Sequence, residues 1–197
     1  MGKRTQFDAE YYQRFYLDPT TRVTDEAQVQ RLGAFVASYL RYLDVAVNEV
    51  LDVGCGIGLW RAVIAEEFPG ANYLGMEVSE YLCQRYGWTR GSITELGGQA
   101  RYDLVICQGV LQYLTGAQAR AAIENLGRVC RGALYLEALT REDWDEGVAD
   151  QARSDGNIHL RSAGFYRRQL APYFVHVGGG VWVSQRADVP LYALERA

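Results

Sequence analysis

The feature that most constrains the fold is a glycine-rich turn that follows a short apolar segment. Residues 47 to 53 are mostly apolar and β-branched, which is typical of a central parallel strand, whereas residues 57 to 68 carry apolar side chains at helical spacing. Gly54, Gly56 and Gly58 lie at this junction. Glycines there let a ligand approach the backbone, and the free N–H groups that open a helix favour electron-rich groups. The turn therefore predicts a cradle for a nucleotide cofactor.

Length and composition indicate one domain and argue against several kinds of partner. A chain of 197 residues with 49% hydrophobic content is long enough for one well-buried core and short for two, so we expect a single domain over residues 1 to 197. The net charge of −4 and the pI of about 5.3 disfavour a nucleic-acid partner. The four cysteines are scattered without a Cys-x-x-Cys pair, which predicts reduced thiols and no metal site.

Two regions follow from the pattern of the chain. Residues 1 to 44 form an N-terminal cap with a tyrosine-rich segment and a predicted helix over residues 25 to 43, with Thr24 at its start. Residues 45 to 197 form the core, where strand-like and helix-like segments alternate, as in a parallel sheet with crossover helices. Its predicted segments before the C-terminal part are residues 47 to 53, 57 to 68, 72 to 77, 79 to 86, 102 to 107, 115 to 131 and 133 to 138.

The C-terminal part differs from this alternation. It predicts a helix over residues 162 to 173, an apolar strand over residues 174 to 182 and a last strand over residues 189 to 195. The two strands are expected to pair as an antiparallel hairpin. The three consecutive glycines at 178 to 180 leave an alternative open, in which they form the turn of an earlier hairpin.

The first motif resembles that of the class I S-adenosylmethionine (SAM) dependent methyltransferases. In that superfamily an acidic residue and Gly-x-Gly-x-Gly follow the first strand, as do Asp52 and the glycines here. The resemblance implies an α/β, Rossmann-like fold: a mostly parallel seven-stranded sheet with helices on both faces and an antiparallel last strand. It also implies SAM as the cofactor, with Asp52, Gly54, Cys55 and Gly56 in its site.

Three later segments carry the resemblance further along the chain. Glu77, at the end of a strand, matches the acid that holds the ribose hydroxyls, and Val78 is expected against the adenine. Ser92 stands where many relatives have an aspartate for the adenine amino group, with Ile93 as an apolar partner for the ring. Gln108 ends the segment that resembles the fourth motif, beside the methionine half. Ligands of open parallel sheets bind outside the carboxyl ends of the strands, where these residues fall.

The remaining site residues are candidates for holding the cofactor carboxylate and for catalysis. Arg22 is a candidate clamp for the cofactor carboxylate, because its guanidinium offers a fork of donors. His159 is the candidate catalytic base, since an imidazole is neutral at working pH. Tyr12 is a second candidate catalytic residue, whose phenol would position the acceptor. It belongs to a group of aromatic residues expected to fold over the cofactor: Phe7, Tyr11, Tyr12, Phe15 and Tyr16.

The resemblance implies transfer of a methyl group from SAM to a small-molecule acceptor. Gln108 is not followed by the Pro-Pro-Tyr of relatives that methylate amino groups in nucleic acids, and Glu137 is a further residue that could face the acceptor. Two alternatives stay open. The first is a non-catalytic protein or partner subunit that binds SAM or a nucleoside. The second is a NAD-dependent oxidoreductase, which is disfavoured because Leu59 occupies the third glycine position of the dinucleotide fingerprint. The sequence also predicts a cytoplasmic monomer or homodimer without a membrane segment.

Overall fold

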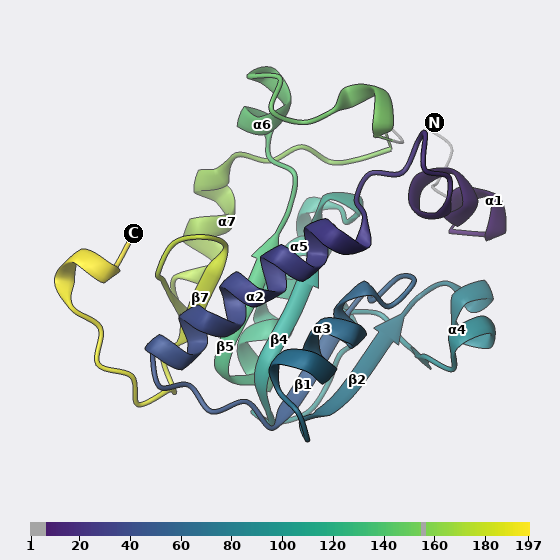
Figure 1. Cartoon of the computed structure of the whole chain (residues 1–197). Helices are drawn as coiled ribbons and strands as arrows, with labels where there is room; N and C mark the ends of the chain where they lie inside the picture. The colour runs from purple at the N-terminus through teal and green to yellow at the C-terminus, as the bar shows by residue number, and fades with distance from the viewer. Residues whose placement is uncertain (1–6, 155–156) are drawn as a thin grey trace.

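The computed structural model describes residues 7 to 154 and 157 to 197, so the first six residues of the predicted N-terminal cap lie outside the described residues. The core is one seven-stranded sheet with the order β3-β2-β1-β4-β5-β7-β6 (Figure 1). The strands are β1 Glu49–Val53, β2 Asn72–Glu77, β3 Thr89–Arg90, β4 Tyr102–Gln108, β5 Cys130–Glu137, β6 Phe174–His176 and β7 Val181–Ser184.

The parallel part of the sheet is built around β1, which pairs with β2 on one side and β4 on the other. Val50 and Leu51 are fully buried, as are Leu104 and Ile106 on β4, because helices cover both faces of a parallel sheet. Strands β2 and β3, and β4 and β5, are also parallel pairs. The carboxyl ends of β1, β2, β4 and β5 therefore lie at one edge, as the sequence predicted.

The C-terminal strands resolve the two predicted alternatives. Gly178, Gly179 and Gly180 all have positive φ and form the turn between β6 and β7, so the expected pairing of residues 174 to 182 with residues 189 to 195 is wrong. Residues 189 to 195 form no strand; they contain Pro190, which has no N–H to donate, and end in a 3-10 turn, Ala193–Glu195. The antiparallel last strand is nevertheless confirmed: β7 runs against both β5 and β6.

Helices pack on both faces of the sheet, as predicted. Helix α2, Glu26–Tyr42, and helix α3, Leu59–Glu67, cover one face (Figure 1). Helix α5, Gly116–Val129, and helix α7, Ala163–Leu170, cover the other, while α4, Glu80–Tyr86, packs beside β2 and β3. No helix among the described residues combines the length and hydropathy needed to cross a membrane.

The start of α2 differs from the prediction by one residue. Asp25, not Thr24, caps the helix: its carboxylate accepts a hydrogen bond from the Gln28 N–H at 2.8 Å, and the Gln28 side chain accepts one from the Asp25 N–H at 3.0 Å. This reciprocal capping box satisfies two otherwise free backbone donors, which Thr24 with Ala27 three residues later would not do.

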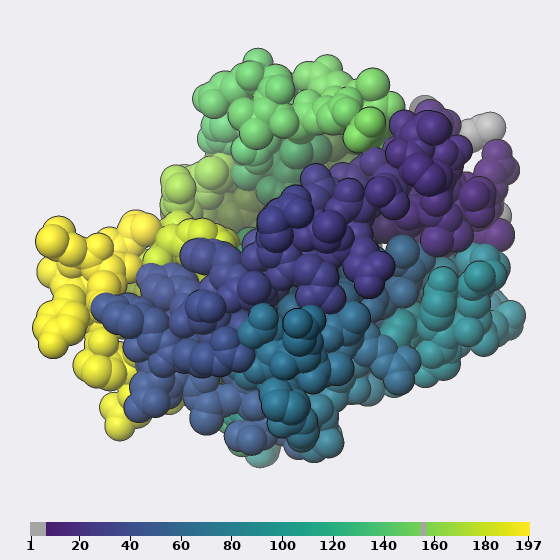
Figure 2. All heavy atoms as spheres, viewed as in Figure 1, coloured from purple at the N-terminus to yellow at the C-terminus, as the bar shows by residue number. Residues whose placement is uncertain are grey.

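The N-terminal segment lies at the carboxyl edge of the sheet. It forms α1, Ala9–Tyr12, and continues directly into a π-helical turn, Gln13–Leu17, a conformation frequent at functional sites. The Ser79 hydroxyl donates to the Phe7 carbonyl at 2.6 Å, and the hydroxyls of Tyr11 and Tyr113 lie 2.9 Å apart. In the space-filling view this segment and the segment after β5 that holds α6, Arg141–Asp145, lie at the same end of the molecule (Figure 2).

Candidate ligand-binding site

The glycine turn after β1 leaves room for a ligand. Gly54 and Gly56 have φ values of 68° and 54°, in the left-handed region that favours glycine. A Cβ at Gly54 would lie 2.5 Å from a methyl group of Val110, so this glycine is needed for packing against the loop after β4. A Cβ at Gly56 would meet nothing nearer than the Gly54 oxygen at 4.0 Å. The turn thus faces open space at Gly56.

Glu77 connects the end of β2 to this turn. Its carboxylate is buried and accepts hydrogen bonds from three backbone N–H groups: Gly56 at 3.0 Å, Val78 at 2.8 Å and Ser79 at 2.9 Å. A carboxylate has about four acceptor positions, so at least one remains for a ligand hydroxyl. The same hydrogen bonds orient the carboxylate and the glycine turn relative to each other.

Asp52 lies beneath the turn rather than at the mouth of the crevice, where the sequence placed it. Its side chain is only 2% exposed, and one carboxylate oxygen accepts a hydrogen bond from the Tyr73 hydroxyl at 2.5 Å. Burial, opposed by the Tyr73 hydrogen bond and assisted by the charge of Glu77, raises the pKa of Asp52 to about 7. Asp52 still borders a cavity and is therefore close enough to affect a ligand there.

Two adjoining cavities lie at the carboxyl edge of the sheet, with volumes of about 640 Å³ and 100 Å³. They share several bordering residues: Tyr11, Tyr16, Gly54, Gly56, Gln108, Gly109 and Tyr113. The lining of the smaller cavity is that expected of an adenosine site, because it combines the Glu77 carboxylate with apolar side chains. The larger cavity extends under the segment after β5.

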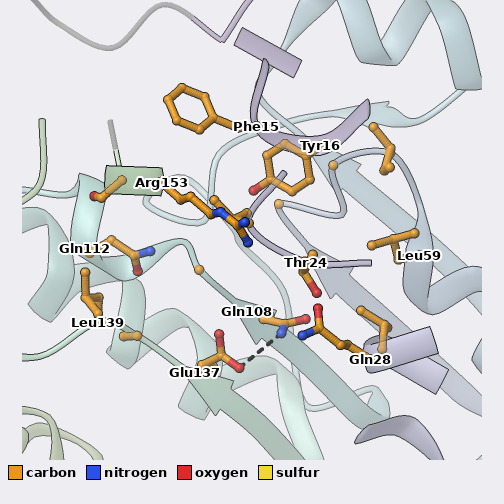
Figure 3. Close-up of a pocket in the computed structure, with 18 of the residues that line it drawn as sticks. Phe15, Tyr16, Thr24, Gln28, Leu59, Gln108, Gln112, Glu137, Leu139 and Arg153 are labelled. Carbon is orange, nitrogen blue, oxygen red and sulfur yellow. Dashed lines mark hydrogen bonds between the residues drawn. The ribbon is translucent and has the colours of Figure 1, made fainter. Parts of the chain in front are cut away.

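A hydrogen-bonded chain of side chains lines the larger cavity. The Trp60 indole N–H donates to Gln108 Oε1 at 2.7 Å, and Gln108 Nε2 donates to Glu137 Oε2 at 3.1 Å (Figure 3). The Tyr135 hydroxyl donates to the same Glu137 oxygen at 3.1 Å. These contacts hold the ends of β4 and β5 in one orientation toward the cavity.

The structure brings most of the predicted cofactor residues to these two cavities. Glu77, Val78, Ser92 and Ile93 line the smaller cavity, and Asp52 and Cys55 line the larger one. Gly54, Gly56 and Gln108 border both. These residues meet at the cavities because they come from the carboxyl ends of neighbouring parallel strands, which lie at one edge of the sheet.

The aromatic residues of the N-terminal segment also line the cavities, as the lid prediction requires. Tyr11 and Tyr16 border both cavities, Phe7 and Tyr12 the smaller one, and Phe15 the larger one. Tyr12 is 4% exposed, and burial, assisted by the charge of Glu77, strongly raises its pKa. Its phenol therefore stays protonated at neutral pH and is able to donate a hydrogen bond, but it does not act as a base.

Two predicted residues border neither cavity. Arg22 pairs with Asp25 at 3.5 Å, because both belong to the turn that opens α2. His159 has an exposed side chain, and its backbone N–H donates to the Gln112 carbonyl at 2.7 Å. This hydrogen bond fixes the strand-like segment before α7 and leaves the imidazole outside the site, so the structure offers no geometry for His159 as a base.

Sequence reasoning missed Arg153, which extends into the larger cavity (Figure 3). It ends a short 3-10 turn, Gln151–Arg153, and its guanidinium lies 3.4 Å from the Asp150 carboxylate. Arg153 is the only basic residue among the described residues that line the larger cavity. No pattern marks it in the sequence, because its position depends on how the segment after β5 folds back.

The sheet order with a reversed β7, together with the glycine turn and the adjoining cavities, defines a Rossmann-like fold of the methyltransferase type. Comparison with known proteins agrees with this class. A family model described as a methyltransferase domain matches residues 51 to 132. The match agrees with the resemblance of the sequence motifs to the class I SAM-dependent methyltransferases.

Two curated relatives each match about a third of the chain. A malonyl-[acyl-carrier protein] O-methyltransferase of Legionella pneumophila is 35% identical over 69 residues, which cover 32% of this chain and 24% of that protein. A trans-aconitate 2-methyltransferase of Deinococcus radiodurans is 34% identical over 74 residues, which cover 34% of this chain and 28% of that protein. The chain thus spans about a quarter of the length of these relatives.

Among solved structures, a magnesium protoporphyrin IX methyltransferase from Synechocystis with bound SAM superposes with a TM-score of 0.60. The sequences are 20% identical, and the match covers 89% of this chain and 90% of that chain. At this identity the similarity shows a shared fold over nearly the whole of both chains.

Proposed function

We propose that this protein binds SAM and transfers its methyl group to a small-molecule acceptor. The observation that carries the proposal is the open space at Gly56, where the two cavities adjoin under the ends of β1, β2 and β4. The relatives named above are methyltransferases, and one solved structure of this fold holds SAM, which supports the same cofactor here.

The residues of the smaller cavity suit the adenosine half of SAM. Glu77 offers acceptor capacity for a ribose hydroxyl, and the apolar side chains of Val78 and Ile93 suit the faces of an adenine ring. Val78 is 47% exposed, an unusual amount for a valine in a crevice, and a bound ring would cover it. Ser92 lies beside them, with its hydroxyl 2.8 Å from that of Thr94.

The larger cavity suits the methionine half and the acceptor. Arg153 would hold the cofactor carboxylate, the role that the sequence had suggested for Arg22, because a guanidinium and a carboxylate form charge-assisted hydrogen bonds. When bound, SAM would supply a methyl group on a positively charged sulfur. A nucleophile that approaches the methyl carbon in line displaces the sulfur from it. The main tasks of the protein are then to align the acceptor and to exclude water. The aromatic residues of the N-terminal segment, which line one or both of the cavities, would serve the second task.

The four cysteines are free, with Cys55, Cys107 and Cys130 buried, which supports a reducing compartment. We therefore propose a cytoplasmic location for the protein. It would act there as a monomer or homodimer, which light scattering would distinguish.

Titration calorimetry with SAM, S-adenosylhomocysteine and NAD tests the proposed cofactor. We expect saturable binding of SAM and of S-adenosylhomocysteine and none of NAD; binding of NAD alone would refute the proposal in favour of an oxidoreductase. Incubation with SAM and a panel of metabolites, followed by detection of S-adenosylhomocysteine, tests turnover. Binding of SAM with no product from any panel member favours the non-catalytic alternative.

A further inference from the structure

The Glu137 carboxylate, at the end of β5, faces the larger cavity with one oxygen uncommitted. Its side chain is exposed, and its Oε2 atom accepts the two hydrogen bonds from Gln108 and Tyr135 described above. Among the described residues, no hydrogen bond or ion pair reaches its Oε1 atom. A carboxylate oxygen that accepts two donors is oriented, and the other oxygen is left for a ligand.

The direction of these hydrogen bonds requires Glu137 to be an acceptor. An indole N–H only donates, so Trp60 fixes the Gln108 amide with its oxygen toward the indole and its NH₂ group toward Glu137. The Tyr135 hydroxyl donates as well, and burial, together with the charge of Glu137, raises its pKa so that it keeps its proton. Both neighbours therefore present donors to Glu137 Oε2.

Glu137 lies next to the place where the cavities adjoin. Gln108, its hydrogen-bond partner, borders both cavities, whereas Glu137 borders only the larger one. If adenosine occupies the smaller cavity, the transferable methyl group is presented at this border. Glu137 is then placed beside a nucleophile that approaches from the larger cavity.

Three other carboxylates border the same cavity: Asp52 is buried beneath the glycine turn, and the other two lie on the outer segment. Asp143 accepts from the Thr140 N–H at 2.9 Å and hydroxyl at 2.6 Å at the start of α6. Asp150 accepts from the Ala152 N–H at 3.1 Å and pairs with Arg153. Their carboxylates stabilise turns on the outer segment, and neither is hydrogen-bonded to a residue that borders both cavities, as Glu137 is to Gln108.

We propose that the uncommitted Glu137 oxygen holds the N–H or O–H of the acceptor, so that the acceptor is an amine or a hydroxyl compound rather than a carboxylic acid. This inference rests on the proposed function. The proton of the acceptor passes to Glu137, and the lone pair so released forms the bond from nitrogen or oxygen to the methyl carbon. The carbon–sulfur bond breaks, and its electron pair stays on the sulfur of S-adenosylhomocysteine. A carboxylic acid acceptor is already ionised at neutral pH, and its charge would be repelled by Glu137.

Binding of two matched probes tests this inference without knowledge of the acceptor. Both are 5′-amino-5′-deoxyadenosine derivatives whose 5′ nitrogen carries the aminobutyrate chain of SAM and, in place of the methyl group, a propyl chain; the propyl chain ends in an ammonium group in one and in a carboxylate in the other. Calorimetry on the full chain measures their affinities, with S-adenosylhomocysteine as the reference ligand. The variant is Glu137→Gln, which keeps the size of the side chain and an oxygen that accepts from Tyr135. The control is Glu66→Gln, an exposed carboxylate on α3 that borders neither cavity.

We expect the wild type and Glu66→Gln to bind the ammonium probe on the order of tenfold more tightly than the carboxylate probe. In Glu137→Gln the ratio should fall to near one, with the affinity for S-adenosylhomocysteine unchanged. A ratio near one or below in the wild type, or a ratio that survives in Glu137→Gln, overturns the inference. Failure of S-adenosylhomocysteine to bind the wild type would instead refute the proposed function. Thermal melts confirm that the variants are folded, and Glu137→Asp, which keeps the charge, serves as the second variant and should retain a preference for ammonium.

Discussion

The buried carboxylate of Asp52 makes the stability of the protein depend on pH in an unusual direction. Its pKa rises from the ordinary 3.8 to about 7 in the folded chain, because burial disfavours the ionised form. Below pH 4 the group is protonated in both folded and unfolded states. Between pH 4 and 7 the unfolded chain has lost this proton while the folded chain keeps it, so the contribution of Asp52 to stability falls as pH rises.

The magnitude follows from the two pKa values. At about 1.4 kcal/mol per pH unit, the rise in pKa corresponds to about 4 kcal/mol of stability lost by pH 7, after which the loss is constant. The Asp52→Asn variant removes the ionisation and keeps an oxygen that accepts from the Tyr73 hydroxyl. Relative to the wild type, its free energy of unfolding should therefore increase by about 3 kcal/mol between pH 5 and pH 8.

Urea denaturation of the ligand-free protein at pH 5 and pH 8 measures this difference. Every other titrating group is shared by the two proteins, so their difference isolates Asp52. A constant difference between the variant and the wild type across this range would refute the reasoning, since it would mean that Asp52 is ionised in the folded chain as readily as in water.

Four further predictions concern ligand binding and are checked by calorimetry with SAM. Glu77→Gln should weaken binding by about tenfold or more, because a ribose hydroxyl loses a charged acceptor; equal affinity would remove Glu77 from the ribose site. Gly56→Val should weaken it by ~100-fold, since the side chain enters the open space and the left-handed backbone disfavours valine; normal binding would show that the turn faces no ligand. Arg153→Ala should weaken it by about fivefold, as expected for an exposed ion pair of about 1 kcal/mol, whereas Arg22→Ala should have no effect, and the reverse result would restore the sequence-based assignment. His159→Ala should retain SAM binding, and also turnover once an acceptor is found, because the imidazole lies outside both cavities; loss of turnover alone would show that the loop closes over the acceptor.

The sequence was sufficient for the parts of the fold that depend on local patterns. The apolar strands, the capping box at Thr115 and Gln118, and the glycine turn follow from residues near one another in the chain. The convergence of Glu77, Ser92 and Gln108 was also predictable, because parallel strands joined by crossovers end at one edge. The β6–β7 hairpin stayed ambiguous, since both strand pairings had suitable turn residues until the sheet neighbours were known.

Only the tertiary structure decided which charged residues face the larger cavity. Arg22 and His159 had the right chemistry, but contacts local to the α2 turn and to the loop before α7 keep them outside it. Arg153 and Glu137 enter it because the segment after β5 folds back over the sheet edge and because Trp60 and Gln108 orient the end of β5. Periodicity and motif spacing report how a side chain lies relative to its own helix or strand. The direction in which a loop side chain points depends on contacts between distant segments, and these form only in the folded chain.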